Sequence, residues 1–118
     1  MLRRMPNSKR SIEQVFIALS DPTRRAVVQK LSEGSATVSQ LAQPFDMALP
    51  SFTQHLGVLE NAGLIMSQRQ GRSRVCTLNP LALKAAEDWM ASHRKQWESR
   101  LDRFETHLEK IKEEKSSD

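Results

Sequence analysis

The sequence is poor in cysteine, aromatic residues and glycine, and these shortages limit what the protein can be. Its single cysteine, Cys76, excludes an intrachain disulfide framework and a metal site made only of cysteines from one chain. Aromatic residues make up 5% of the 118 residues, which disfavours a β-sandwich because aromatic side chains stabilise sheets. With 38% hydrophobic and 27% charged residues, we expect one mainly helical domain with a modest core.

The chain also lacks the signatures of membrane insertion and catalysis. No apolar run approaches the about 20 residues that span a bilayer, and no signal peptide is recognisable. A Ser/His/Asp arrangement, a glycine-rich phosphate loop and an inward pair of carboxylates are all missing. We therefore expect a soluble, cytoplasmic protein with no membrane partner, no enzyme activity and no cofactor.

Charge is distributed unevenly along the chain, whose net charge is +4. Residues 1–11 contain no acid and are interpreted as a flexible basic arm, with the bases Arg3, Arg4, Lys9 and Arg10. Residues 11–46 carry a net charge of −1, residues 47–86 of +3 and residues 87–118 of −2. The middle of the chain therefore suits an anionic partner best.

Apolar spacing and capping residues predict two helices before the middle of the chain. Apolar residues recur at helical spacing from Ile12 to Leu19 and predict the first. Asp21 is suited to cap the next helix, with Pro22 in its first position, where a missing N–H costs nothing. Gly34 then closes this second helix.

A helix-turn-helix is predicted to follow. Thr37 and Gln40 match the capping-box pattern, so a short helix begins at about Val38, and Pro44 ends it. A fourth helix finishes at Gly63. Its predicted inward face consists of Leu49, Phe52, Leu56 and Leu59.

Two β-prone runs around Gly71 predict a hairpin. A long helix over about residues 80–111 and a polar tail at 112–118 complete the chain. The predicted fold is mainly α with a small β-hairpin, in the order α-α-α-α-β-β-α. Residues 12–111 form one winged helix-turn-helix domain in this prediction.

The long last helix carries an apolar stripe with a mean spacing of about 3.5 residues. It comprises Leu83, Ala86, Met90, His93, Trp97, Leu101, Phe104, Leu108 and Ile111. At 1.5 Å per residue the stripe is about 42 Å long, more than a small domain's own core can cover. We therefore expect a homodimer formed through the terminal helices by Phe16, Met90, Trp97, Leu101, Phe104 and Leu108.

The fourth predicted helix has the features of a DNA-reading helix. No acid lies between Met47 and Leu59, and Ser51 and Gln54 fall opposite the apolar face. Short polar side chains at an exposed helix start fit a major groove. We predict DNA contacts from Pro50, Ser51, Thr53, Gln54 and His55.

The predicted hairpin adds positive charge next to this helix. Between Met47 and Ala86, Glu60 is the one acid against four bases. Guanidinium groups on a protruding turn can reach phosphates or a minor groove. We predict DNA contacts from Arg69, Arg72 and Arg74.

Residues 18–24 (ALSDPTR), 53–64 (TQHLGVLENAGL) and 69–72 (RQGR) together resemble the ArsR/SmtB family of winged-helix transcriptional repressors. The resemblance covers roughly residues 12–78. It implies a symmetric dimer that binds a near-palindromic double-stranded DNA operator and blocks transcription. It assigns Ser51, Thr53, Gln54 and His55 to the major groove and Arg69 and Arg72 to the wing. The extended, Trp-containing last helix is similar to a subgroup without metal sensing, and its effector ligand is unknown.

The sequence departs from the family pattern where metal-sensing members carry their ligands. Residues 40–43 (QLAQ) replace a cysteine-bearing stretch and so lack the thiolates that soft metals need. His93 and His107 lie 14 residues apart, about 21 Å along one helix, so a single helix cannot use both on one ion. Ala48 stands where the family places a Ser-like helix cap. No metal site is predicted.

Two alternatives remain open at this point. A metal- or redox-responsive repressor of the same fold would use His93, His107 or Cys76, although a lone thiol in a strand is usually a packing residue. A protein-interaction module would use the winged helix as a scaffold and dock a partner on the long helix. Salt-dependent binding to duplex DNA separates the second alternative from a DNA-binding regulator.

Overall fold

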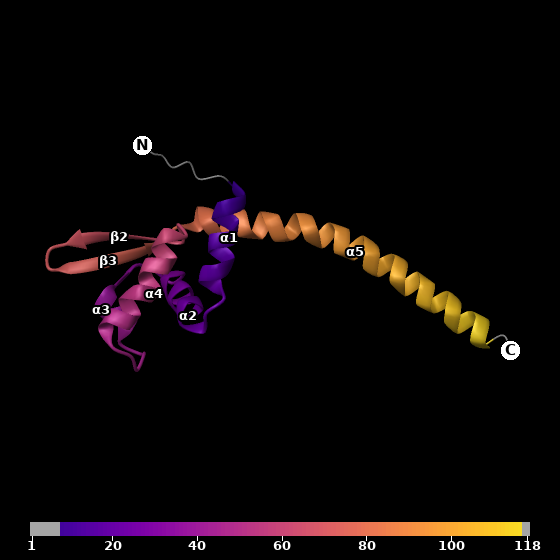
Figure 1. Ribbon diagram of the computed structural model, residues 1–118, viewed down its shortest axis with the longest axis horizontal. Coiled ribbons are helices and arrows are strands. Elements are labelled where there is room, and N and C mark those ends of the chain that lie inside the picture. The colour runs from indigo at the N-terminus through magenta and orange to yellow at the C-terminus, as the bar shows by residue number, and fades with distance from the viewer. Residues whose placement is uncertain (1–7, 117–118) are drawn as a thin grey trace. The chain divides into compact units, whose positions relative to one another are not determined.

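The computed structural model describes residues 8–116, which form five α-helices and one three-stranded antiparallel sheet (Figure 1). In chain order the elements are α1 (Ser8–Leu19), α2 (Pro22–Leu31), β1 (Ala36–Thr37), α3 (Val38–Ala42), α4 (Leu49–Asn61), β2 (Ile65–Gln70), β3 (Ser73–Leu78) and α5 (Pro80–Ser116). The mainly helical class and the helix-turn-helix followed by a hairpin are confirmed. The chain divides into two compact units, Met1–Ala86 and Glu87–Asp118.

Local capping determines where α2 and α3 begin. The carboxylate of Asp21 accepts a hydrogen bond from the backbone N–H of Arg24 at 3.0 Å, with proline next to the cap. In α3, the Thr37 hydroxyl accepts from the Gln40 backbone N–H, and the Gln40 side-chain oxygen accepts from the Thr37 backbone N–H. Both starts satisfy N–H groups that a helix leaves unpaired, as predicted.

The short strand β1 is the one element that the sequence analysis missed. It pairs antiparallel with β3, with Ala36 opposite Cys76 and Thr37 opposite Val75. The strand order is therefore β1-β3-β2. Two residues cannot display an alternating pattern, so β1 forms because β3 offers it a partner. It joins the helix-turn-helix to the hairpin.

A single core holds the first unit together. The largest fully buried side chains are Phe52, Leu41, Leu59, Leu64, Ile65, Val15, Val27 and Cys76. The start of α5 contributes the buried Ala86 together with Ala82 and Leu83. The core therefore draws on all five helices and the sheet, and it holds the inner face of α4 in place.

Leu49 does not belong to this core, which corrects the predicted inward face of the fourth helix. Phe52, Leu56 and Leu59 are buried, but Leu49 is 56% exposed. Phe45 in the preceding loop packs instead against Phe52, with ring centroids 5.5 Å apart. The prediction is therefore wrong at Leu49, the first residue of α4, where Phe45 of the preceding loop supplies the apolar contact to the core.

Two predicted boundaries also shift. α1 begins at Ser8 rather than Ile12, because the added residues are polar and leave no apolar signal. Residues 1–7 of the predicted basic arm lie outside the described residues. α5 continues to Ser116 rather than ending near residue 111, because its last turns are Lys- and Glu-rich and these residues favour a helix.

The second unit consists of α5 beyond Ala86. Six large apolar side chains of this segment are 42–59% exposed: Trp89, Met90, Trp97, Leu101, Phe104 and Leu108. Among the described residues, no helix combines the length and apolarity needed to cross a membrane.

Candidate nucleic-acid interface

The helix α4 has a buried face and an exposed polar face. Its buried face packs into the core, whereas Pro50, Ser51 and Gln54 are exposed. The Thr53 hydroxyl is also exposed and donates a hydrogen bond to the carbonyl of Pro50 at 3.0 Å. The first two turns of α4 therefore display an amide and two hydroxyl groups, and no acid lies between Met47 and Leu59.

Another predicted contact on α4, His55, lies at the flank of this face and is half-buried. Its Nδ1 is 3.0 Å from Nη1 of Arg24 and 3.8 Å from Oδ2 of Asp21. Both partners come from the start of α2. The structure thus places His55 between the exposed face of α4 and the neighbouring helix, a position that spacing along the sequence does not reveal.

Arg24 is a residue that the sequence analysis quoted but gave no role. Its Nε donates to the carbonyl of Ala18 at 2.8 Å and its Nη2 to that of Ile17 at 3.2 Å. The last carbonyls of a helix have no partner within the helix, so Arg24 completes the end of α1. Because Arg24 lies on α2 and also contacts His55 on α4, it connects α1, α2 and α4. In the sequence, the feature that could have indicated this role is the 18–24 motif, which ends with Arg24.

Asp21 remains readily ionised in this cluster. The backbone N–H of Arg24 stabilises its carboxylate and is the main reason that the pKa of Asp21 lies below its usual value. Partial burial opposes this effect, and the positive charges of His55, when protonated, and Arg24 add to it. The N-cap of α2 therefore keeps its acceptor to lower pH than an ordinary aspartate.

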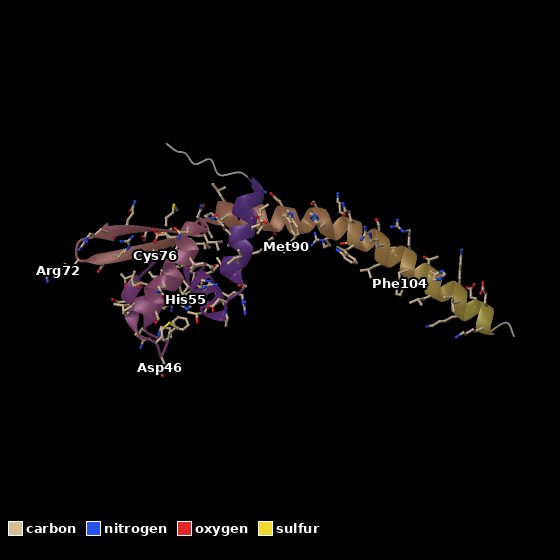
Figure 2. The ribbon with its side chains drawn as sticks, viewed as in Figure 1. Asp46, His55, Arg72, Cys76, Met90 and Phe104 are labelled. Carbon is tan, nitrogen blue, oxygen red and sulfur yellow. The ribbon has the colours of Figure 1, made fainter. Side chains whose placement is uncertain are left out.

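The hairpin β2–β3 presents three exposed arginines, Arg69, Arg72 and Arg74. Its turn contains Gly71 with φ +62°, a left-handed backbone that favours glycine. Arg69 and Arg72 are exposed there, and Figure 2 shows Arg72 at the tip. Arg69 lies opposite Arg74 in the register of the two strands. Like charges placed opposite each other repel, so this end of the hairpin favours a bound anion.

Arg74, the third predicted arginine of the wing, also makes contacts within the chain. Its Nε donates to the hydroxyl of Ser67 at 3.0 Å. Its Nη2 is 3.8 Å from Oε2 of Glu60 on α4. Arg74 therefore connects the hairpin with the end of α4 and partly neutralises Glu60.

Two of the candidate sensory residues, Cys76 and His93, are packed against other groups of the chain. Cys76 is 1% exposed, and burial is the main cause that raises the pKa of its thiol. His93 Nδ1 is 2.9 Å from the carbonyl of Trp89, and the two rings stack with centroids 4.0 Å apart. Within residues 8–116 no group of three or more His, Cys, Asp or Glu side chains could hold a metal ion.

The predicted dimerisation residues fall into both units. Phe16 lies on α1 in the first unit, where it is half-buried and packs against the core. The other five lie on α5 in the second unit and are exposed. Arg100 places its guanidinium carbon 5.6 Å from the centroid of the Trp97 ring.

Comparisons with known proteins place these features in a family. A family model described as a helix-turn-helix domain matches residues 19–68. The transcriptional repressor SdpR of Bacillus subtilis is 35% identical over 79 residues, which are 67% of this chain and 88% of SdpR. The HTH-type transcriptional regulator Rv2034 of Mycobacterium tuberculosis is 40% identical over 76 residues, which are 64% of this chain and 71% of that regulator.

A solved structure supports the same assignment. The crystal structure of an ArsR family transcriptional regulator matches with a TM-score of 0.71 and 50% identity, over 75% of this chain and 97% of the other. The relatives are regulators and not enzymes, in agreement with the sequence prediction. The chain therefore belongs to the ArsR family of DNA-binding, winged helix-turn-helix transcriptional regulators.

Proposed function

We propose that the protein is a homodimeric repressor that binds a near-palindromic double-stranded DNA operator and needs no metal ion to do so. The observation that carries this proposal is the two-faced character of α4. Phe52, Leu56 and Leu59 are buried in the core, and Ser51 and Gln54 are exposed on the opposite face. A helix held in this way by a rigid core can enter a major groove with its polar face.

The side chains of α4 and those of the hairpin then have different roles in DNA binding. The Gln54 amide can donate to and accept from the edge of one base, which is the contact that discriminates sequence. Close to Gln54 on the same helix lie the other predicted contacts of α4: Pro50, Ser51, Thr53 and His55. Arg69 and Arg72 supply charge for phosphates or a minor groove, and such contacts raise affinity for every sequence alike. Arg74 adds its charge from the same end of the hairpin, where it lies opposite Arg69.

The homodimer is supported by the apolar surface of α5. Trp97, Leu101 and Phe104 are each at least half exposed, and burying such side chains against a second copy stabilises association. Phe16, Met90 and Leu108 complete the proposed interface. In a two-fold symmetric dimer, the two α4 helices can occupy major grooves about 34 Å apart on one side of the duplex.

Metal independence is supported by the ligand chemistry of the described residues. The short helix α3 and its end contain Gln40 and Gln43 rather than cysteines. The His93 ring stacks on the Trp89 ring with centroids 4.0 Å apart. Within residues 8–116 it belongs to no group of three or more side chains that could hold a metal ion together.

The proposal is tested by selecting bound duplexes from a random library at two salt concentrations. We expect enrichment of a near-palindrome whose half-sites lie about one helical turn apart, with affinity that falls as salt rises. No enrichment at low salt would reject DNA recognition and favour a protein-interaction module. Adding zinc, a chelator or an oxidant to the selected duplex should leave affinity unchanged. A shift with any of them would favour a metal- or redox-responsive repressor.

A further inference from the structure

The contact between Arg24 and His55 determines which ring nitrogen carries the imidazole proton. Nη1 of Arg24 lies 3.0 Å from Nδ1 of His55. A guanidinium group has donors and no acceptor, so Nδ1 has to accept this hydrogen bond. The proton of the neutral ring is therefore on Nε2.

The guanidinium that imposes this tautomer is itself held firmly. Three hydrogen bonds fix Arg24: from its backbone N–H to Asp21, from Nε to Ala18 and from Nη2 to Ile17, at 3.0, 2.8 and 3.2 Å. A planar guanidinium with several of its donors engaged has little freedom to rotate. His55 therefore meets a donor whose position is set by two other helices.

The second ring nitrogen of His55 is available for a ligand. Within the described part of the chain, Nε2 makes no hydrogen bond, and the side chain is 23% exposed. His55 follows Gln54 directly on α4 and lies beside the polar face that the proposed function places in the major groove. An N–H donor at this position can meet an acceptor atom of DNA.

We propose that Arg24 is a positioning residue for DNA binding: it holds His55 in the Nε2–H tautomer, and this N–H donates to an acceptor atom of the bound duplex. The acceptor is a phosphate oxygen or an oxygen or nitrogen on a base edge. This inference rests on the proposed function, because it assumes that α4 contacts the operator. It assigns to the 18–24 motif a task in recognition besides the capping of α1.

Two substitutions of His55 distinguish the roles of its two ring nitrogens. The amide nitrogen of Gln can occupy the place of Nε2 and keep the donor to DNA, whereas Asn is too short for this and keeps only an acceptor near Nδ1. For the duplex selected above, we expect H55Q to bind within about threefold of the original protein and H55N about tenfold more weakly, the loss of one hydrogen bond. Equal affinities of H55Q and H55N would overturn the proposal.

A double-variant cycle tests whether Arg24 acts through His55. Arg24→Lys keeps the charge but cannot reproduce the fixed fork of donors. We expect it to weaken DNA binding by about fivefold when His55 is present and by less than about twofold in H55Q, whose donor does not depend on Arg24. A purely structural Arg24 would weaken both proteins equally, which would also overturn the proposal. Thermal unfolding of each variant shows whether loss of the fold contributes.

Nuclear magnetic resonance tests the tautomer without DNA. The chain has three histidines, and the His55 signals are those that vanish in H55Q. We expect the ¹⁵N shifts of His55 to show a protonated Nε2 and an unprotonated Nδ1, and Arg24→Lys to give a mixture of tautomers. A protonated Nδ1 in the neutral ring would overturn the inference. Failure of the original protein to bind any duplex would instead reject the proposed function.

The source of the acceptor follows from the same binding data. If the H55N loss is equal for the selected duplex and for unrelated duplexes, Nε2–H donates to a phosphate. If the loss is confined to the selected duplex, it donates to a base edge. Replacing single guanines or adenines of the half-site by their 7-deaza analogues, which lack the N7 acceptor, then identifies the base.

Discussion

At the scale of single residues, the polar side chains of α4 differ in how firmly they are held. Ser51 and Gln54 are exposed, and their side chains can adapt to a base edge. His55 and Glu60 instead contact arginines of α2 and β3. The helix therefore combines adaptable side chains, Ser51 and Gln54, with side chains held by arginines, His55 and Glu60. This combination favours discrimination of sequence by Gln54 and a constant orientation of the helix.

Gln54 and Arg72 should have separable effects on DNA binding. Gln54→Ala is expected to relax the sequence preference, at about 1–3 kcal/mol for the base pair that it reads. Arg72→Ala is expected to weaken binding to all duplexes alike and to lower the salt slope by about one, because it removes one phosphate contact. Binding measured at several salt concentrations, with the selected duplex and a scrambled one, checks both. The same loss of specificity in both variants would contradict this division.

Substitutions of Leu49 and Leu56 form a matched pair that tests how burial on α4 contributes to the free energy of unfolding. Both were predicted to face inward, yet Leu56 is 5% exposed and Leu49 is 56% exposed. We expect Leu56→Ala to lower the free energy of unfolding by about 2–5 kcal/mol and Leu49→Ala by less than about 0.5 kcal/mol. Urea unfolding followed by circular dichroism measures both values. A large loss from Leu49→Ala would mean that this residue is covered in solution.

Residue exposure could be predicted from the sequence only where periodicity determines it. The spacing of Phe52, Leu56 and Leu59 places Ser51 and Gln54 on the outer face, and the structure agrees. The contact of His55 with Arg24 joins residues 31 positions apart. No local pattern reports such a pair, because it depends on how α2 packs against α4. The same holds for Arg74 and Glu60.

At the scale of elements, short segments depend most on local hydrogen bonds. α3 has five residues, too few to be stable as an isolated helix. Its capping box and the pairing of Thr37 with Val75 hold its start in place. The capping box was predictable because its residues are three positions apart. β1 was not, because its partner strand lies about 40 positions further along the chain.

Thr37 should therefore contribute more to stability than its partly exposed position suggests. We expect Thr37→Ala to lower the free energy of unfolding by about 1 kcal/mol, because the Gln40 N–H loses its acceptor. Thr37→Ser keeps the hydroxyl and serves as the control, with a loss of a few tenths of a kcal/mol. Chemical unfolding of the three proteins decides between them. Equal losses for Ala and Ser would attribute the effect to the methyl group rather than to the cap.

At the scale of the whole molecule, the two units differ in how they bury apolar residues. The first unit buries most of its apolar residues in its own core, whereas the second is a single helix with an exposed stripe. A lone helix cannot cover its own apolar face. The sequence predicted this imbalance, since the stripe is longer than the core that it could join. It did not predict the division after Ala86.

Trp97 tests whether the stripe joins two copies of the chain. Trp97→Glu is expected to yield monomers and to abolish operator binding, because a buried unpaired charge opposes association. Trp97→Leu keeps an apolar side chain and should remain dimeric. Sedimentation equilibrium at several protein concentrations measures the state of each. A Trp97→Glu protein that sediments as a stable dimer would show that the interface lies elsewhere.

The start of α4 has a consequence for the dynamics of recognition. Ala48 offers no side-chain acceptor to the helix that follows, and Leu49, which is 56% exposed, adds little burial there. The first turn should therefore open more often than the rest of α4, and its amide hydrogens should exchange with solvent faster than those near Leu56. Ordering this turn on the duplex would then reduce the net affinity. Ala48→Ser, which restores the acceptor, should slow amide exchange in the free protein and tighten binding, mainly through slower dissociation.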